Sequence, residues 1–160
     1  MKLAGGSVAP LPEMWEAGVP VGLGTDGPAS NNSLDMFDTM KVCALAHKAH
    51  RWDPKVASAQ RVLDMATIDG ARAIGKEKEI GSIEKGKQAD LVLVDLKEPN
   101  MMPIHGKETV ISDLVYSASG YNVDTTIVDG KVLMKDRKYL RLDPAKIEEG
   151  VNASVRRLMH

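Results

Sequence analysis

The sequence is poor in cysteine, and that scarcity excludes several kinds of protein. Cys43 is the single cysteine among the 160 residues. No disulfide can therefore form within the chain, and a cysteine-rich zinc site cannot be built from it. The first residues contain glycines and prolines where a secretory signal would have an apolar run. Together with the lone thiol, this predicts a cytoplasmic setting.

Long hydrophobic runs and an excess of one charge are also missing. No apolar stretch approaches the roughly 20 residues that a membrane-spanning helix needs. The 21 Lys and Arg residues against 22 Asp and Glu residues give a formal net charge of −1, which argues against electrostatic binding to nucleic acid. The hydrophobic content of 43% predicts a folded core. The length falls short of the about 250 residues of a complete (β/α)₈ barrel.

The patterns that are present predict an α/β first part and a β-rich second part. Apolar periodicity predicts helices over residues 11–17, from residue 34 onward, and over 55–66, 68–74, 110–116 and 144–159. Asn32 or Ser33 is expected to cap the helix that starts at residue 34. Apolar runs predict buried strands at 19–23 and 89–96, and a loop is expected at 25–33. Asp129-Gly130 predicts a type I′ hairpin between strands 125–128 and 131–134.

The motif G-L-G-T-D-G at residues 22–27 has the spacing of a dinucleotide-binding loop. A dinucleotide site would also require a helix that opens at the last glycine, but Pro28 and the polar residues after it intervene. Asp26 would place a negative charge beside the pyrophosphate. The expected second strand with its terminal acidic residue is replaced by a helical pattern, so a dinucleotide site is disfavoured.

Asp26 is the candidate functional residue of this loop. It follows the carboxyl end of the expected strand 19–23, where ligands of α/β proteins collect. Its carboxylate can ligate a metal or accept a proton from a metal-bound water, and it can equally cap a turn. Ser30 and Asn31 can hydrogen-bond a polar substrate or cap the next helix, and the residues alone leave these alternatives open.

The histidines and the cysteine give weaker signals. His47 and His50 are spaced i, i+3 on the expected helix, but no carboxylate or thiolate accompanies them at a matching spacing, so we expect a partly exposed structural pair. Cys43 lies in an apolar helical stretch and is expected to be buried rather than nucleophilic.

Several motifs together resemble the amidohydrolase superfamily, in particular its branch of 5′-methylthioadenosine/S-adenosylhomocysteine deaminases and chlorohydrolase-like enzymes. The loop around Asp26 is similar to the family's eighth-strand motif. The resemblance covers essentially the whole chain and is carried by these segments: residues 2–6, V-G-L-G-T-D-G-P-A-S-N-N at 21–32, L-D-M-F at 34–37, A-T-I-D-G-A-R-A-I-G at 66–75, G-S-I-E-K-G-K-Q-A-D-L-V at 81–92, L-V-Y-S-A at 114–118, and 123–130.

The resemblance implies an α/β fold, namely the C-terminal part of a metal-dependent (β/α)₈ barrel hydrolase with part of its small β-sandwich. Residues 1–75 would be terminal strand–helix units of the barrel, 76–142 part of the sandwich, and 143–160 a C-terminal helix. The implied reaction is hydrolytic deamination of an adenine ring by a water bound to zinc or iron. Asp26 would ligate the metal and help to deprotonate that water, and Ser30 and Asn31 would face the substrate.

The sequence also departs from the family pattern. It lacks the H-x-H pair of the first strand, the histidines of the fifth and sixth strands and the proton-shuttling glutamate. We therefore expect a C-terminal fragment that is inactive alone and that associates with a missing N-terminal barrel portion or with a second copy of itself. The alternatives are another amidohydrolase activity, such as that of a chlorohydrolase or a guanine deaminase, and a non-catalytic assembly module.

Overall fold

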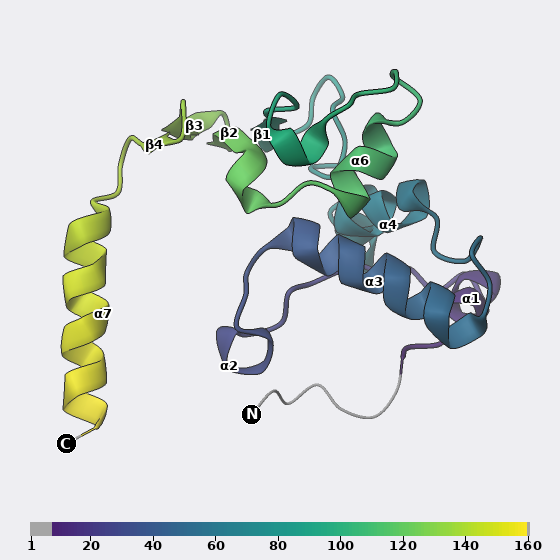
Figure 1. Ribbon diagram of the computed structural model, residues 1–160, viewed down its shortest axis with the longest axis horizontal. Coiled ribbons are helices and arrows are strands. Elements are labelled where there is room, and N and C mark those ends of the chain that lie inside the picture. The colour runs from purple at the N-terminus through teal and green to yellow at the C-terminus, as the bar shows by residue number, and fades with distance from the viewer. Residues whose placement is uncertain (1–7, 160) are drawn as a thin grey trace.

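The computed structural model describes residues 8–159 (Figure 1). The stretch 2–6, which carries part of the family resemblance, lies outside the described residues. No helix among the described residues is long and apolar enough to cross a membrane. The elements follow in this order: α1 (Leu11–Glu16), α2 (Pro28–Asn31), α3 (Met36–Arg51), α4 (Ala59–Ala66), α5 (Ile68–Ala73), β1 (Leu91–Val94), η1 (Pro99–Met101), α6 (Val110–Tyr116), η2 (Gly120–Asn122), β2 (Val123–Val128), β3 (Lys131–Lys135), β4 (Lys138–Tyr139) and α7 (Pro144–Leu158).

The hydrophobic core lies where α3, α4 and α6 pack against one another. Its buried side chains are Met40 and Ala44 of α3, Val62 of α4, Val115 of α6, and Ala57 in the turn before α4. The buried residues of α3 recur at helical spacing, so this helix turns one apolar face to the core. Because α6 belongs to the later half of the chain, this core joins both halves.

The sheet is antiparallel and has the strand order β1-β2-β3-β4. Leu91 of β1 lies opposite Ile127 of β2, and Val128 of β2 lies opposite Lys131 of β3. Asp129 and Gly130 both adopt positive φ angles, 50° and 72°, as a type I′ turn requires. The hairpin prediction is thus confirmed, whereas the short strand β4 was not predicted.

The two predictions of buried strands are wrong in part. Residues 19–23 form no strand in the described structure, because no neighbouring strand pairs with them, although the amide of Leu23 donates to the carbonyl of Met65 at 2.9 Å. The run at 89–96 does form β1, but only over Leu91–Val94. The Val92 and Leu93 side chains of β1 are 54% and 49% exposed, since nothing in the described chain covers them.

Several element boundaries also differ from the prediction. Residues 25–33 are not all loop, because they contain the short helix α2. The cap of α3 is Asp35, not Asn32 or Ser33: its backbone is extended and its carboxylate accepts the amide of Phe37 at 2.9 Å. Helix α4 begins at residue 59 rather than 55, because the Ser58 hydroxyl caps it there.

Helix α7 lies apart from the helical core and follows the end of the sheet (Figure 1). Its amphipathic pattern predicts a helix over 144–159, and the observed helix Pro144–Leu158 agrees. None of its residues is buried. The stripe of Ile147, Val151, Val155 and Leu158 is exposed to solvent.

Candidate functional site

The loop that carries Asp26 begins where an extended segment, residues 19–24, meets the two short helices α4 and α5. The Leu23 amide donates to the carbonyl of Met65 at the end of α4. A Cβ placed on Gly22 would lie 2.9 Å from the Cα of Gly70 in α5, so the two backbones touch. This close approach accounts for the first glycine of the G-x-G-x-x-G motif by packing rather than by a dinucleotide.

Asp26 is exposed and has a left-handed backbone with φ 60°. One carboxylate oxygen, Oδ1, accepts the amide of Gly27 at 2.8 Å. The Ser30 hydroxyl and then the Gly27 N–H lower the pKa of the Asp26 carboxyl, because both donate hydrogen bonds to its charged form. The side chain is therefore ionised at neutral pH and open to a cation or to a polar ligand.

Ser30 and Asn31 lie in the same loop as Asp26, on the short helix α2. The Ser30 hydroxyl donates to the Gly27 carbonyl at 2.9 Å. The Asn31 side chain donates to the carbonyl of Ser33 at 3.2 Å. Both side chains thus shape the loop, and their contact with a substrate stays a prediction.

Asp26 fits a metal site as one ligand only. A catalytic zinc takes three protein ligands, and residues 8–159 hold no group of three His, Cys, Asp or Glu side chains that could bind a metal ion. Asp26 nevertheless has the chemistry of a ligand, because it is an ionised and exposed carboxylate. The remaining ligands of a complete site would have to come from residues other than these.

The histidines of α3 do not join Asp26. His47 is 5% exposed and lines an apolar groove of about 360 Å³ between residues 21–24 and α3, whereas His50 is exposed. Burial lowers the pKa of His47, so its ring is neutral at pH 7. Burial likewise raises the pKa of the half-buried Cys43, which makes its thiol a poor nucleophile.

One contact near the loop was missed by reasoning from sequence. The Asp35 carboxylate caps α3 through Oδ1, and its Oδ2 accepts the amide of Gly120 at 2.6 Å. The cap had a local signal, since Asp before a helical pattern is a common N-cap. The bond to Gly120 had none, because the two residues are 85 positions apart in the chain.

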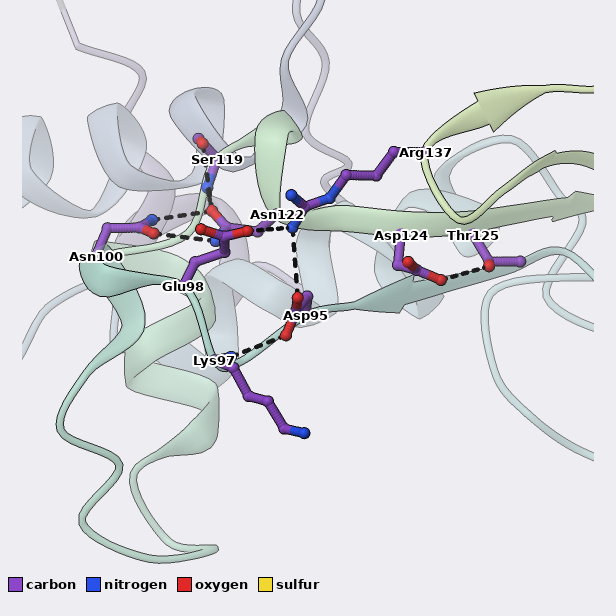
Figure 2. Close-up of polar contacts among 9 residues, drawn as sticks. All are labelled: Asp95, Lys97, Glu98, Asn100, Ser119, Asn122, Asp124, Thr125 and Arg137. Atoms are coloured by element: carbon purple, nitrogen blue, oxygen red, sulfur yellow. Dashed lines mark hydrogen bonds and ion pairs between the residues drawn. The ribbon is translucent and has the colours of Figure 1, made fainter.

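A second polar cluster surrounds Asn122 at the end of η2 (Figure 2). Asn122 is 2% exposed, and its side chain exchanges two hydrogen bonds with Asn100, at 2.9 and 3.1 Å. Its Oδ1 also accepts the amide of Ser119 at 2.9 Å. A cavity of about 230 Å³ adjoins this cluster, and Arg137 lines it while paired with Glu98. Because the polar atoms of Asn122 satisfy neighbouring protein groups, the cluster braces the η2 turn.

Replacing Asn122 by Ala is expected to lower the free energy of unfolding by about 1–2 kcal/mol, because Asn100 and the Ser119 amide lose their shared partner. Urea denaturation monitored by circular dichroism measures this change. The exposed Asn152 on α7 provides the control, since Asn152→Ala removes the same groups from a solvated helix. Equal stability of the two variants would show that the cluster contributes nothing.

Known proteins match the part of the chain that contains both the Asp26 loop and the Asn122 cluster. The family model described as the amidohydrolase family matches residues 3–133. The 5-methylthioadenosine/S-adenosylhomocysteine deaminase of Thermococcus onnurineus is 56% identical over 138 residues, which are 86% of this chain and 31% of that protein. The 5′-deoxyadenosine deaminase of Methanobrevibacter smithii is 44% identical over 158 residues, 99% of this chain and 36% of that protein.

A solved structure agrees with these sequence matches. The adenosine deaminase of Xanthomonas campestris with bound zinc superposes with a TM-score of 0.86 at 38% identity, over 91% of this chain and 33% of that one. The chain thus spans about a third of the length of the proteins it matches. The matched third is their C-terminal part.

Proposed function

This chain belongs to the amidohydrolase family, and from that premise we propose that it is the C-terminal part of a metal-dependent aminohydrolase that deaminates an adenosine-type nucleoside. The observation that carries the proposal is the exposed, ionised carboxylate of Asp26, at the end of an extended segment and inside the matched residues. The relatives support the substrate class, since their names specify 5-methylthioadenosine, S-adenosylhomocysteine and 5′-deoxyadenosine.

The proposal includes the architecture of the whole enzyme. Residues 1–75 would supply terminal strand–helix units of a (β/α)₈ barrel, 76–142 part of a composite β-sandwich, and 143–160 the C-terminal helix. In favour of this, residues 19–24 are extended without a paired strand in the described chain, and one outer strand, β1, leaves Val92 and Leu93 exposed. Unpaired backbone and bare apolar side chains are the surfaces that further strands cover. We propose that the missing barrel portion, or a second copy of the chain, covers them.

Asp26 would be the residue of this chain that holds the divalent metal, zinc or iron. When bound, the metal would supply an activated water. The loop would keep Asp26 ionised through Gly27 and Ser30, and in this role Ser30 and Asn31 would lie on the substrate side. The incomplete ligand set among residues 8–159 means that the chain alone should bind metal weakly.

A chimera tests the proposal most directly. The segment of the Thermococcus onnurineus deaminase that matches this chain is replaced by the chain, and ammonia release is measured with 5′-methylthioadenosine and S-adenosylhomocysteine. We expect the zinc-loaded chimera to deaminate both nucleosides, and the 160-residue chain by itself to deaminate neither. Guanine and a chlorinated triazine are assayed in parallel to separate the other amidohydrolase activities.

Three outcomes would each contradict one part of the proposed function. Deamination by the chain alone would overturn the proposal that it is an incomplete part of the enzyme. A chimera that folds and binds zinc but acts only on guanine or the triazine would overturn the nucleoside substrate. A chimera that folds, binds zinc and acts on none of these compounds would favour a non-catalytic assembly module.

A further inference from the structure

We propose that Asp35 is a positioning residue that ties the loop carrying Asp26 to the η2 turn. The meaning of this role for catalysis rests on the proposed function, because that function makes Asp26 the metal ligand. The tie itself rests only on contacts within the chain. These contacts hold the loop at both ends, and Asp35 forms the second of the two attachments.

The loop between the extended segment and α3 needs to be held. Asp26 and Asn32, near its two ends, both adopt left-handed backbone conformations, with φ 60° and 63°. Asp and Asn tolerate such angles better than other residues with a side chain, but they adopt them only where the surroundings select that conformation. A loop with two such residues therefore depends on the attachments that flank it.

The first attachment precedes Asp26. The Leu23 amide donates to the Met65 carbonyl at 2.9 Å, and Gly22 lies against Gly70 of α5. This end of the loop is thus fixed to the α4–α5 helix pair, three residues before the carboxylate.

The second attachment is Asp35. Its amide donates to the Ser33 hydroxyl at 3.1 Å, so the end of the loop is bonded to the same residue that caps α3. Its Oδ2 accepts the Gly120 amide at 2.6 Å, a charge-assisted bond. A Cβ on Gly120 would lie 3.1 Å from Oδ2, so the carboxylate rests directly on the glycine backbone.

The turn that receives Asp35 is itself rigid. Gly120 begins η2, and the buried Asn122 ends it. The Asn122 side chain bonds the Ser119 amide and Asn100, as Figure 2 shows. The Asp35 carboxylate therefore connects the end of the Asp26 loop to a turn that is braced by Asn122.

The test separates the tie from the cap. In Asp35→Ser the hydroxyl can still cap α3, as Ser is a preferred N-cap, but it is too short to bond Gly120 as well. Hydrogen exchange of the full chain is measured by NMR at Ser30, Asn31 and Asn32, whose amides bond the carbonyls of Gly27 and Pro28. We expect exchange at these amides to become roughly tenfold faster, because a charge-assisted bond that fixes the loop is lost.

Three comparisons make the outcome specific. The Phe37 and Thr39 amides of the α3 cap and the amides of α4 are expected to keep their exchange rates. Asp38→Ser, which removes an exposed carboxylate from the same helix turn, is expected to change none of these rates. Unchanged exchange at residues 30–32 in Asp35→Ser, or equal acceleration at the cap and in the loop, would overturn the proposal.

A second variant, and a measurement that does not depend on activity, keep this proposal separate from the proposed function. Should Asp35→Ser fail to fold, Asp35→Asn makes the same comparison with one acceptor oxygen in place of two. The exchange experiment needs no catalytic activity. If the chimera deaminates nothing while residues 30–32 loosen as expected, the proposed function fails and the tie stands. If the chimera is active and the loop does not loosen, the tie fails and the function stands.

Discussion

Asp26→Asn in the chimera is expected to lower the rate of nucleoside deamination by at least about 100-fold. Loss of groups that merely support metal ligands costs 10–100-fold, and loss of a ligand's charge should cost no less. The substitution is nearly isosteric, and the Asn side-chain oxygen can still accept the Gly27 amide that Oδ1 accepts now. The loop should thus keep its shape while the negative charge disappears. Steady-state kinetics and zinc content are measured together.

The matched control is Asp38→Asn, which removes an exposed carboxylate from the first turn of α3. It should leave both the rate and the zinc content unchanged. An Asp26→Asn chimera that retains its rate and its zinc would show that Asp26 is a turn residue without a metal role. A variant that keeps zinc but loses the rate would assign Asp26 to proton transfer rather than to metal binding.

The sequence predicts those elements whose signals are local. Helix α6 occupies the predicted residues 110–116, and the hairpin turn follows from the left-handed preferences of Asp129 and Gly130. The segment 19–23 fails as a strand for the opposite reason, since a strand is defined by hydrogen bonds to a neighbour. Its apolar pattern predicts a buried position, yet Val19 is exposed because nothing in the described chain lies over it.

The candidate site also has features that the local sequence predicts and contacts that it does not. The position of Asp26 after an extended segment follows from the order of residues along the chain, and its exposure agrees with a role at the surface of a site. Its role as a ligand stays a prediction. The contacts that hold the loop could not be predicted, because Asp35 meets Gly120 and Leu23 meets Met65 across long intervals of sequence. No local pattern encodes which distant backbone amide a carboxylate will reach.

Gly22 belongs to the G-x-G-x-x-G motif, but packing against another backbone explains why this position is a glycine. In a dinucleotide site the first glycine of G-x-G-x-x-G serves the tight turn, but here Gly22 is required by the close approach of the Gly70 backbone. A methyl group at residue 22 would lie 2.9 Å from the Gly70 Cα and 3.6 Å from the Ala73 Cβ. Since the nearest atom belongs to a backbone, no rotation of a side chain can relieve the overlap, and the extended segment must move away from α5.

Gly22→Ala is therefore expected to lower the free energy of unfolding by about 3 kcal/mol, because the added methyl group overlaps a backbone that cannot move aside by itself. The melting temperature should fall by roughly 10 °C. Hydrogen exchange at the Leu23 amide should accelerate as well, because the displaced segment lengthens its bond to Met65.

Gly24→Ala is the matched control: no atom lies within 4 Å of its added Cβ, so its stability should stay within about 0.5 kcal/mol of the parent chain. Equal loss of stability in both variants would mean that flexibility, rather than the contact with Gly70, requires these glycines. A selective loss at residue 22 would show that the close contact with α5 requires glycine there.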